Sequence, residues 1–297
     1  MKKEITAELA NEKLNIKEFL ESCCSLSSRK VKQLLKQKKI LINNKTAYYD
    51  SSVRCGDRIV FDMSETHKDS TVPEEIPLDI VYEDEYYLAV NKPAGILVHP
   101  TQNHPCNTLA NGVKFYFLSK GLDIPVRLAN RIDMDTSGLV IIAKSGMAHS
   151  AIAEQFKVES CKKIYIAIAE GHFEPAKGTI DKPIGIDDEN PIRRAIRDDG
   201  QRCITEYEVV EQYKKSALVR LNLITGRTHQ IRVHLSSIGH PLLGDKLYNG
   251  SMECMQRQAL HAYEMVFKHP YTNKEMKLQA KVPEDMQRLI EHLKHMK

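Results

Sequence analysis

The pattern of apolar and polar positions divides the chain into two folded parts with a polar stretch between them. In the first part, apolar residues recur at helical spacing in two short segments, and Leu26-Ser27-Ser28 offers an N-cap for the second. These apolar positions are Ile16, Phe19 and Leu20 in one segment and Val31, Leu34 and Leu35 in the other. Short strands are predicted at 40–42 and 58–61. Residues 62–77 are polar, contain two prolines and lack periodicity, which predicts a linker.

The second part, residues 78–297, mixes predicted strands with predicted helices. Hairpins are predicted at 78–82 with 86–91 and at 205–210 with 217–223, and single strands at 139–143 and 162–169. Helices are predicted at 151–157, from a Thr228 cap to Gly239 and Pro241, and from Pro283 onward with that proline in the first turn. Residues 139–143 are all apolar and have polar neighbours, so we expect a strand buried inside a sheet.

The composition narrows the class of protein. A chain of 297 residues with 42% hydrophobic residues can form one large domain or two smaller ones with a substantial core. Its seven cysteines are scattered without a C-x-x-C pair, which predicts free thiols in a reducing compartment rather than disulfides. Neither a secretory signal nor an apolar span stands out, so we expect a cytoplasmic protein without a membrane partner.

The distribution of charge is more informative than the net charge of +4. Between residues 25 and 49 there are seven basic residues and no acidic one. On the second predicted helix, Arg29, Lys32 and Lys36 lie opposite the apolar face, and such one-sided charge can neutralise phosphates. We therefore expect these three residues to contact RNA, and the alternative is an ordinary solvated helix face. The basic stretch at 193–197 could form a further loop over RNA.

The loop before the buried strand, residues 130–138, contains the strongest candidate chemistry. Asp133 and Asp135 stand at the mouth of that strand, and Arg131 can keep a neighbouring carboxylate ionised. Three interpretations are open: an acidic surface turn, a calcium loop, and a catalytic carboxylate acting as nucleophile. A calcium loop needs a bidentate Glu at its last position, which here is Lys144. A phosphoryl-accepting aspartate is also disfavoured, because polar residues interrupt the segment before Asp133.

The chain shows few signs of a cofactor. It has no Rossmann or phosphate-loop motif, so we expect no nucleotide cofactor. His99, His104 and Cys106 could begin a metal site, but no second cluster of ligands completes it. We therefore expect neither a metal nor an organic cofactor.

The loop sequence Asn130-Arg131-Ile132-Asp133-Met134-Asp135-Thr136-Ser137-Gly138 resembles the signature of the RluA-type RNA pseudouridine synthases. That family carries His-Arg-Leu-Asp, two variable residues and Thr-Ser-Gly, so the chain departs from it at Asn130 and Ile132. Other motifs in the family's order are Asn91-Lys92-Pro93-Ala94-Gly95, Lys163-x-Tyr165, Thr225-Gly226-Arg227-Thr228-His229-Gln230-Ile231-Arg232 and Gly239-His240-Pro241-Leu242-Leu243-Gly244-Asp245. The resemblance covers about Ile76 to Val282.

This resemblance implies an enzyme that isomerises uridine in RNA to pseudouridine: the N-glycosidic bond breaks, the uracil turns, and carbon five rejoins the ribose. Asp133 would be the nucleophile, and Arg232 would orient it and keep it ionised, with Arg227 as the second choice for that pairing. Tyr165 would stack on the base and assist removal of the proton from carbon five. Arg131 would occupy the space that the flipped nucleotide leaves.

The same resemblance implies the architecture and the partner. Residues 14–61 resemble a small RNA-binding module first known from a ribosomal protein of the small subunit. The catalytic part would have an α+β fold, with a mixed, largely antiparallel sheet, flanking helices and a cleft. Large-subunit ribosomal RNA is the expected substrate, with transfer RNA as the alternative, and Lys163 and Arg227 are expected to bind it together with Arg131.

Two other functions stay open at this point. A non-catalytic RNA-binding protein could have kept the same fold; it would be favoured if Asp133, Tyr165 or Arg232 were replaced, and all three are present. A hydrolytic glycosidase would need two carboxyls at a set separation, and Asp133 and Asp135 could supply them only if both point inward.

Overall fold

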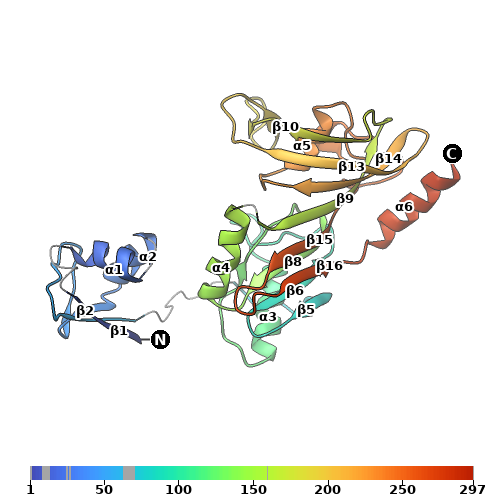
Figure 1. Ribbon diagram of the computed structural model, residues 1–297. Coiled ribbons are helices and arrows are strands. Elements are labelled where there is room, and N and C mark those ends of the chain that lie inside the picture. The colour runs from blue at the N-terminus through green and yellow to red at the C-terminus, as the bar shows by residue number, and fades with distance from the viewer. Residues whose placement is uncertain are drawn as a thin grey trace. The chain divides into compact units, whose positions relative to one another are not determined.

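The protein forms two compact units along the chain, Met1–Lys68 and Asp69–Lys297. The computed structural model describes residues 2–8, 14–24, 26, 28–62, 71–158 and 160–296, without the side chains of Lys2 and Arg29. Figure 1 labels the elements of both units, which are described separately here.

The first unit is a four-stranded antiparallel sheet that packs against two helices. Its elements are β1 (Lys2–Thr6), α1 (Ile16–Cys24), α2 (Ser28–Lys36), β2 (Ile40–Ile42), β3 (Lys45–Thr46) and β4 (Arg58–Asp62), with the strand order β1-β4-β2-β3. The apolar faces predicted for both helices are buried, because Phe19 and Leu34 share one core with Ile59 of β4. Strand β1 was not predicted, and it extends the unit to the N-terminal side of residue 14.

The second unit is built on one ten-stranded sheet. The strands are β5 (Ile80–Glu83), β6 (Tyr87–Lys92), β7 (Arg127–Leu128), β8 (Ser137–Ala143), β9 (Lys162–Glu170), β10 (Lys177–Asp181), β13 (Ile204–Gln212), β14 (Ser216–Leu223), β15 (Leu260–Lys268) and β16 (Glu275–Gln279). The order is β10-β13-β14-β9-β15-β8-β6-β5, with β16 beside β15 and β7 beside β8. Only the contact between β15 and β8 is parallel among these pairs, so the expected mixed, largely antiparallel sheet is confirmed.

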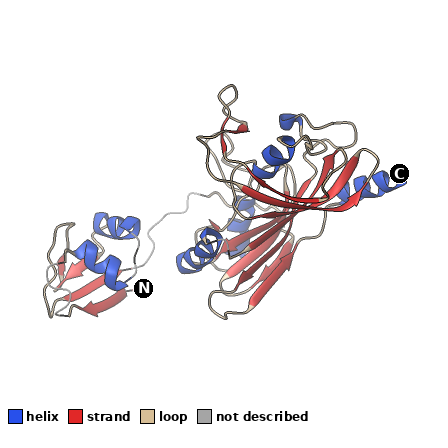
Figure 2. Ribbon diagram, turned by 45° about the horizontal axis from the view of Figure 1, so that its top comes forward, coloured by secondary structure: helices blue, strands red, loops and turns tan. Residues whose placement is uncertain are grey.

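Helices cover both faces of this sheet, as Figure 2 shows. They are α3 (Leu109–Ser119), α4 (Gly146–Lys157), α5 (Gln230–Ser236), a short 3-10 helix (Lys246–Tyr248) and α6 (Glu284–His295), and a separate hairpin joins β11 (Ile184–Ile186) to β12 (Arg194–Ile196). In β8, Leu139 and Ile141 pack on the α4 side, whereas Val140 and Ile142 pack on the α3 side. Burial of both faces explains why the predicted strand is apolar at every position.

Several predicted boundaries differ from the structure. Helix α4 begins at Gly146 rather than 151, because Ser145 caps it through a hydrogen bond from the Ala148 N–H. The Thr228 cap is wrong: α5 begins at Gln230, and the N-cap residue is His229. Pro283 is the N-cap of α6 rather than a residue of its first turn.

The stretch assigned to a linker overlaps the described residues of both units at its two ends. Asp62 is the last residue of β4, and residues 63–70 lie outside the described part of the chain. Residues 71–77 belong to the second unit, where Asn111 of α3 donates a hydrogen bond to the Val72 carbonyl and Glu74 accepts one from the Asn107 N–H. The second unit therefore starts before residue 78.

The contact of β15 with β8 fixes the position of the signature loop. Gly138 has φ +117°, a conformation that other residues rarely adopt, and a Cβ atom there would collide with the backbone of Ala262. Next to it, the Ser137 hydroxyl and His261 Nδ1 form a buried hydrogen bond of 2.9 Å. The Thr-Ser-Gly sequence thus lets β15 approach closely enough to insert between β8 and β9.

Candidate active site

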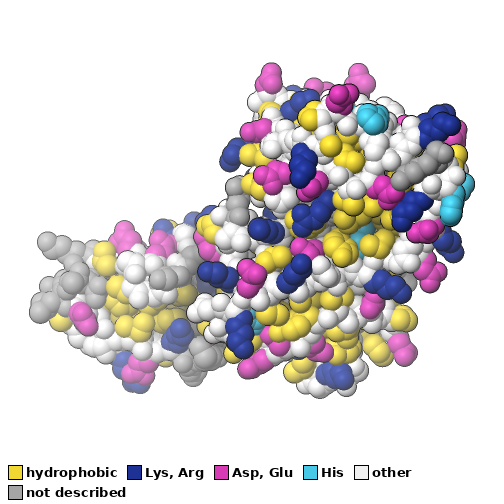
Figure 3. Space-filling view, turned by 45° about the vertical axis from the view of Figure 1, so that its right-hand side comes forward, with side chains coloured by type: hydrophobic (Ala, Val, Ile, Leu, Met, Phe, Trp, Pro, Cys, Tyr) yellow, Lys and Arg dark blue, Asp and Glu magenta, His cyan; other side chains and the backbone are white. Residues whose placement is uncertain are grey.

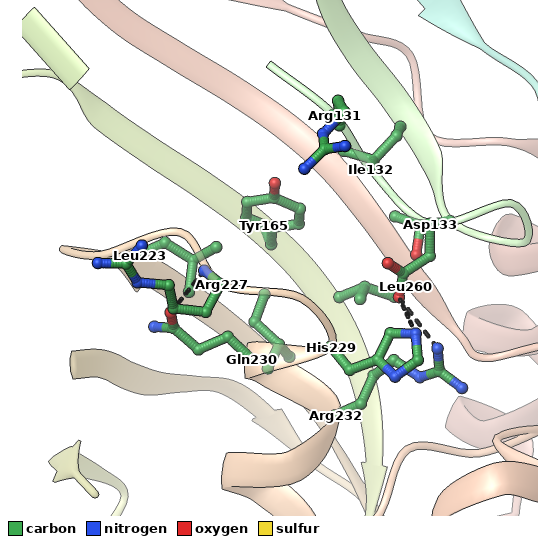
Figure 4. Close-up of a pocket in the computed structure, with 12 residues that line it drawn as sticks. Arg131, Ile132, Asp133, Tyr165, Leu223, Arg227, His229, Gln230, Arg232 and Leu260 are labelled. Carbon is green, nitrogen blue, oxygen red and sulfur yellow. Dashed lines mark hydrogen bonds and ion pairs between the residues drawn. The ribbon is translucent and has the colours of Figure 1, made fainter. Parts of the chain in front are cut away.

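A pocket opens where the signature loop, β9, the end of β14 and the start of α5 meet (Figure 4). It is lined by Arg131, Ile132, Asp133, Thr136, Tyr165, Leu223, Arg227, His229, Gln230, Ile231, Arg232 and Leu260. The three residues expected to perform the chemistry, Asp133, Tyr165 and Arg232, all line it. Asp135 does not, so the pair of inward carboxyls that a hydrolytic glycosidase requires is missing.

Asp133 is held by a buried arginine that a second carboxylate holds in place. Arg232 Nη1 donates to Asp133 Oδ2 at 3.0 Å, while its Nε and Nη2 donate to Asp245 at 2.7 and 2.9 Å. Asp245 is 1% exposed and Arg232 is 7% exposed, so this pairing is shielded from water. Burial alone would lower the pKa of Arg232, but hydrogen bonds and charge from Asp245, followed by Asp133, outweigh burial and raise it.

Tyr165 enters the pocket from β9 and is half-buried. Figure 4 shows its hydroxyl directed toward the side of the pocket where Arg131 lies. Burial, and then the negative charge of Asp133, raise the pKa of this phenol above its usual value. Tyr165 is therefore a neutral phenol at neutral pH, with an aromatic face available in the pocket.

The signature loop is fixed from behind by two basic residues that line no part of this pocket. Lys92 is fully buried, and its ammonium donates to three backbone carbonyls, those of Pro93, Ile96 and Met134, at 2.7–2.8 Å. Arg257 donates to the Asp135 carbonyl at 3.0 Å and forms a bidentate ion pair with Asp285 on α6. Lys92 is the lysine of the Asn-Lys-Pro motif, so this motif positions the loop that bears Asp133.

Asn130 replaces the usual family histidine, and its amide supports the same loop. It donates from Nδ2 to the Leu139 carbonyl at 3.0 Å and accepts from the Ile141 N–H at 2.8 Å. The side chain thus continues the hydrogen bonding of β8 at the point where β7 ends.

The other residues expected to contact RNA fall into two groups. In the second unit, Arg131 and Arg227 are exposed residues of the pocket wall, and Lys163 lies just outside it with its ammonium near Gly226. Arg227 makes no ion pair with Asp133, whereas Arg232, the first choice for that pairing, does. In the first unit, Lys32 and Lys36 are exposed on α2, whereas the side chain of Arg29 lies outside the described part of the chain.

On the face of the second unit that Figure 3 draws, basic side chains do not form one continuous patch. Figure 3 shows a face of the second unit on which Lys and Arg side chains alternate with acidic and hydrophobic ones. In the stretch 193–197, Arg197 is paired with Asp188 and Asp199, and Arg193 lies 3.7 Å from Asp187.

Three residues of the site were not singled out in the sequence, namely His229, Asp245 and Tyr248. His229 Nε2 lies 3.9 Å from Asp133 Oδ2, and the Tyr248 ring lies 5.0 Å from the Arg232 guanidinium. His229 and Asp245 stand in the two motif blocks around residues 225–232 and 239–245, which was the available signal. Nothing in the local pattern marks Tyr248.

The described residues give no indication of a metal or a membrane span. Among them, no group of three or more His, Cys, Asp and Glu side chains could hold a metal ion, and His99, His104 and Cys106 form no such group. None of the helices in that part of the chain combines the length and apolar character needed to cross a bilayer. All seven cysteines are free thiols.

Comparison with known proteins identifies the class. A family model described as RNA pseudouridylate synthase matches residues 86–237. An uncharacterized RNA pseudouridine synthase of Bacillus subtilis (strain 168), YhcT, is 39% identical over 272 residues, covering 91% of this chain and 90% of that protein. The chain therefore belongs to the RNA pseudouridylate synthase family and is an isomerase that acts on uridine in RNA.

Two further proteins are similar, one in sequence and the other in its solved structure. Ribosomal large subunit pseudouridine synthase D of Zymomonas mobilis subsp. mobilis is 42% identical over 236 residues, covering 74% of each chain. The solved structure of human RNA pseudouridylate synthase domain containing 4 has a TM-score of 0.61 and 25% identity, covering 72% of this chain and 92% of that one. The expected pseudouridine synthase fold is thereby confirmed.

Proposed function

We propose that this enzyme isomerises uridines of large-subunit ribosomal RNA and that Asp133 is its nucleophile. The observation that carries the assignment is the asymmetry of the Asp133 carboxylate: Oδ2 is held by Arg232. No partner of Oδ1 is found among the described residues, in a pocket that also contains Tyr165. The choice of RNA is supported by the Zymomonas relative, whose name assigns it to the large ribosomal subunit.

The proposed reaction conserves every atom of the nucleotide except one exchanged proton. Oδ1 of Asp133 forms a bond to carbon one of the ribose, and the bond from that carbon to uracil N1 breaks with its electron pair going to N1. The uracil turns, carbon five attacks the same ribose carbon, and the carboxylate leaves. The proton on carbon five is then released, and N1 takes up a proton from solvent.

Tyr165 fits the second half of this sequence better than the first. While Asp133 is a free carboxylate, its charge helps to keep the phenol protonated. Once Asp133 is bonded to the ribose it carries no charge, so this contribution disappears and the pKa of Tyr165 falls. The phenolate, which is the basic form, is therefore formed more easily during the covalent stage and can take up the proton of carbon five once carbon five has attacked the ribose.

The first unit would hold structured RNA and raise its local concentration at the catalytic unit. Lys32 and Lys36 lie exposed on α2, opposite the buried Val31 and Leu34. Replacing both lysines with glutamate should raise KM for RNA with little change in kcat. It should also make the slope of log affinity against log salt concentration less steep, by the equivalent of about two phosphate contacts. Unchanged salt dependence would remove this module from the RNA interface.

The function is tested by tritium release from large-subunit ribosomal RNA labelled at carbon five of uridine. The wild type should release tritium, and Asp133→Asn should release none. Asp135→Asn is the matched control, because Asp135 lies on the same loop but outside the pocket, and it should remain active. Release by Asp133→Asn would exclude Asp133 as nucleophile. Release from transfer RNA alone would replace ribosomal RNA as the substrate, and binding without release from either RNA would favour a non-catalytic protein.

A further inference from the structure

His229 stands in an unusual backbone conformation beside the proposed nucleophile. Its φ of 56° and ψ of 16° lie in the left-handed region, which residues other than glycine adopt only uncommonly. As the N-cap of α5 it makes no side-chain capping bond, although its carbonyl accepts the Val233 N–H. The side chain instead extends into the pocket, where Figure 4 shows it meeting Asp133 from the same side as Arg232.

The hydrogen bonds around Tyr248 determine which nitrogen of His229 bears the proton. The Arg194 N–H donates to the Tyr248 hydroxyl oxygen at 2.9 Å, and that oxygen lies 3.0 Å from His229 Nδ1. The hydroxyl has a single proton, and among the described residues it has no acceptor other than Nδ1. We therefore assign the hydroxyl as donor to Nδ1, which places the imidazole proton on Nε2.

The opposite arrangement is disfavoured on electrostatic grounds. If Nδ1 carried the proton, the lone pair of Nε2 would face Asp133 Oδ2 across 3.9 Å, and the Tyr248 proton would lose its acceptor. With the proton on Nε2, an N–H dipole points at the carboxylate instead. That distance is longer than a hydrogen bond, but catalytic hydrogen bonds are often long without substrate and shorten in the complex.

Burial favours the neutral form of His229, and the charged groups that face it do not reverse this preference. Burial lowers its pKa, Arg232 and Arg194 lower it as well, and the carboxylates of Asp133 and Asp245 raise it without reversing the direction. A neutral imidazole can present its Nε2–H as a donor to the Asp133 carboxylate without adding a positive charge that would offset the negative charge of that carboxylate. Arg232 donates a hydrogen bond to Oδ2, and the Nε2–H of His229 faces the same oxygen. Oδ1 is thereby left free to form a bond to the ribose.

We propose that His229, locked by Tyr248 as its Nε2–H tautomer, is a positioning residue that fixes the Asp133 carboxylate with Oδ1 toward the substrate. This inference rests on the proposed role of Asp133. It assigns Tyr248 the task of setting the tautomer, which is distinct from the packing of its ring on Arg232. Protonation of His229 at low pH adds a full positive charge beside Oδ2 and weakens the nucleophile.

Two variants separate the tautomer from packing. Tyr248→Phe keeps the ring against Arg232 but removes the hydroxyl, and His229→Asn keeps a residue that tolerates the left-handed conformation while shortening the side chain. Asn should lower kcat by about 10- to 100-fold, and Phe by about three- to tenfold, with KM for RNA within about twofold of wild type. Tyr271→Phe, outside the pocket, is the matched control and should leave kcat unchanged.

The pH profile tests the electrostatic part of the proposal. In Tyr248→Phe the neutral imidazole loses the donor to Nδ1, so the acid limb of kcat attributable to His229 should move to higher pH. In His229→Asn that limb should disappear. A uniform loss of kcat with an unchanged profile in both variants would indicate a merely structural role and would overturn the proposal.

The tautomer itself can be observed without catalysis. A long-range ¹H–¹⁵N correlation spectrum of the full chain should show His229 with an unprotonated Nδ1, its signals being identified by their loss in His229→Asn. Tyr248→Phe should give a mixture of tautomers. A protonated Nδ1 in the wild type would overturn the assignment even if Asp133 is essential, whereas an active Asp133→Asn would refute the proposed function and leave the spectrum unaffected.

Discussion

Replacement of Asp245 by asparagine tests whether the active site depends on the buried ion pair behind it. Arg232 donates two hydrogen bonds to Asp245, which is 1% exposed. Asparagine keeps the shape and one acceptor oxygen, but its NH₂ group would place a donor against an N–H donor of the guanidinium. The negative charge that balances Arg232 is also lost. Breaking a buried ion pair in this way lowers the free energy of unfolding by about 3–5 kcal/mol. We expect the lower end of this range because one hydrogen bond survives.

For a domain of this size, a loss of about 3 kcal/mol lowers the melting temperature by roughly 6–12 °C. Calorimetry of the full chain should show this shift in the larger transition. Glu208→Gln is the matched control, since its partner Lys177 is 73% exposed and the pair lies on the surface; its melting temperature should match that of the wild type.

Activity provides the second measurement on Asp245→Asn. Without Asp245, the guanidinium is free to turn toward Asp133, its remaining carboxylate, and to cover both of its oxygens. We expect kcat in the tritium-release assay to fall at least tenfold at 20 °C, where the variant is still folded, with KM less affected. A variant that melts no lower than the Glu208→Gln control would refute the reasoning that this pair holds the site together.

Three further predictions concern the signature loop. Gly138→Ala should prevent the close contact with Ala262 and yield a protein that is largely unfolded or aggregated on expression, whereas soluble, active protein would show that β15 can shift. Lys92→Met leaves three buried carbonyls without their donor, so we expect about 3 kcal/mol lower stability in urea unfolding and a reduced kcat; an unchanged kcat would separate this lysine from the loop. Burial lowers the pKa of His261 to about 4, so its neutral form contributes about 3 kcal/mol that is present above pH 6.5 and lost as pH falls toward 4. His261→Gln should show a correspondingly smaller drop in unfolding free energy between pH 7 and pH 4.5.

Local sequence patterns identified the elements whose structure is decided by burial. The apolar run at 139–143 became β8 because both of its faces are covered, and the apolar faces of α1 and α2 became the core of the first unit. The first turn of α4 was missed because Met147 is 59% exposed and the segment lacks an apolar face. Periodicity therefore locates elements with a strong apolar face and misses the ends that lack one.

The cap of α5 shows where local rules fail. Thr228 has the usual chemistry of an N-cap, but the helix begins after His229, which has a left-handed backbone and a side chain that meets Tyr248 and lies 3.9 Å from Asp133. Those partners are distant in the sequence, so no window around Thr228 contains the deciding information. In the same way, Asp133 and Arg232 lie 99 residues apart, and only the family motifs indicated that they meet.

The Arg232 guanidinium divides its hydrogen bonds between two carboxylates in the way that the proposed role of Asp133 as nucleophile requires. A bidentate contact with Asp133 would cover both of its oxygens and leave neither for the ribose. Asp245 prevents this by occupying Nε and Nη2, so that only Nη1 reaches Asp133, and only at Oδ2. One guanidinium is thus shared by two carboxylates, which orients Asp133 with Oδ1 free. The proposed chemistry therefore requires the buried Asp245 as much as the arginine itself, although Asp245 lines no part of the pocket.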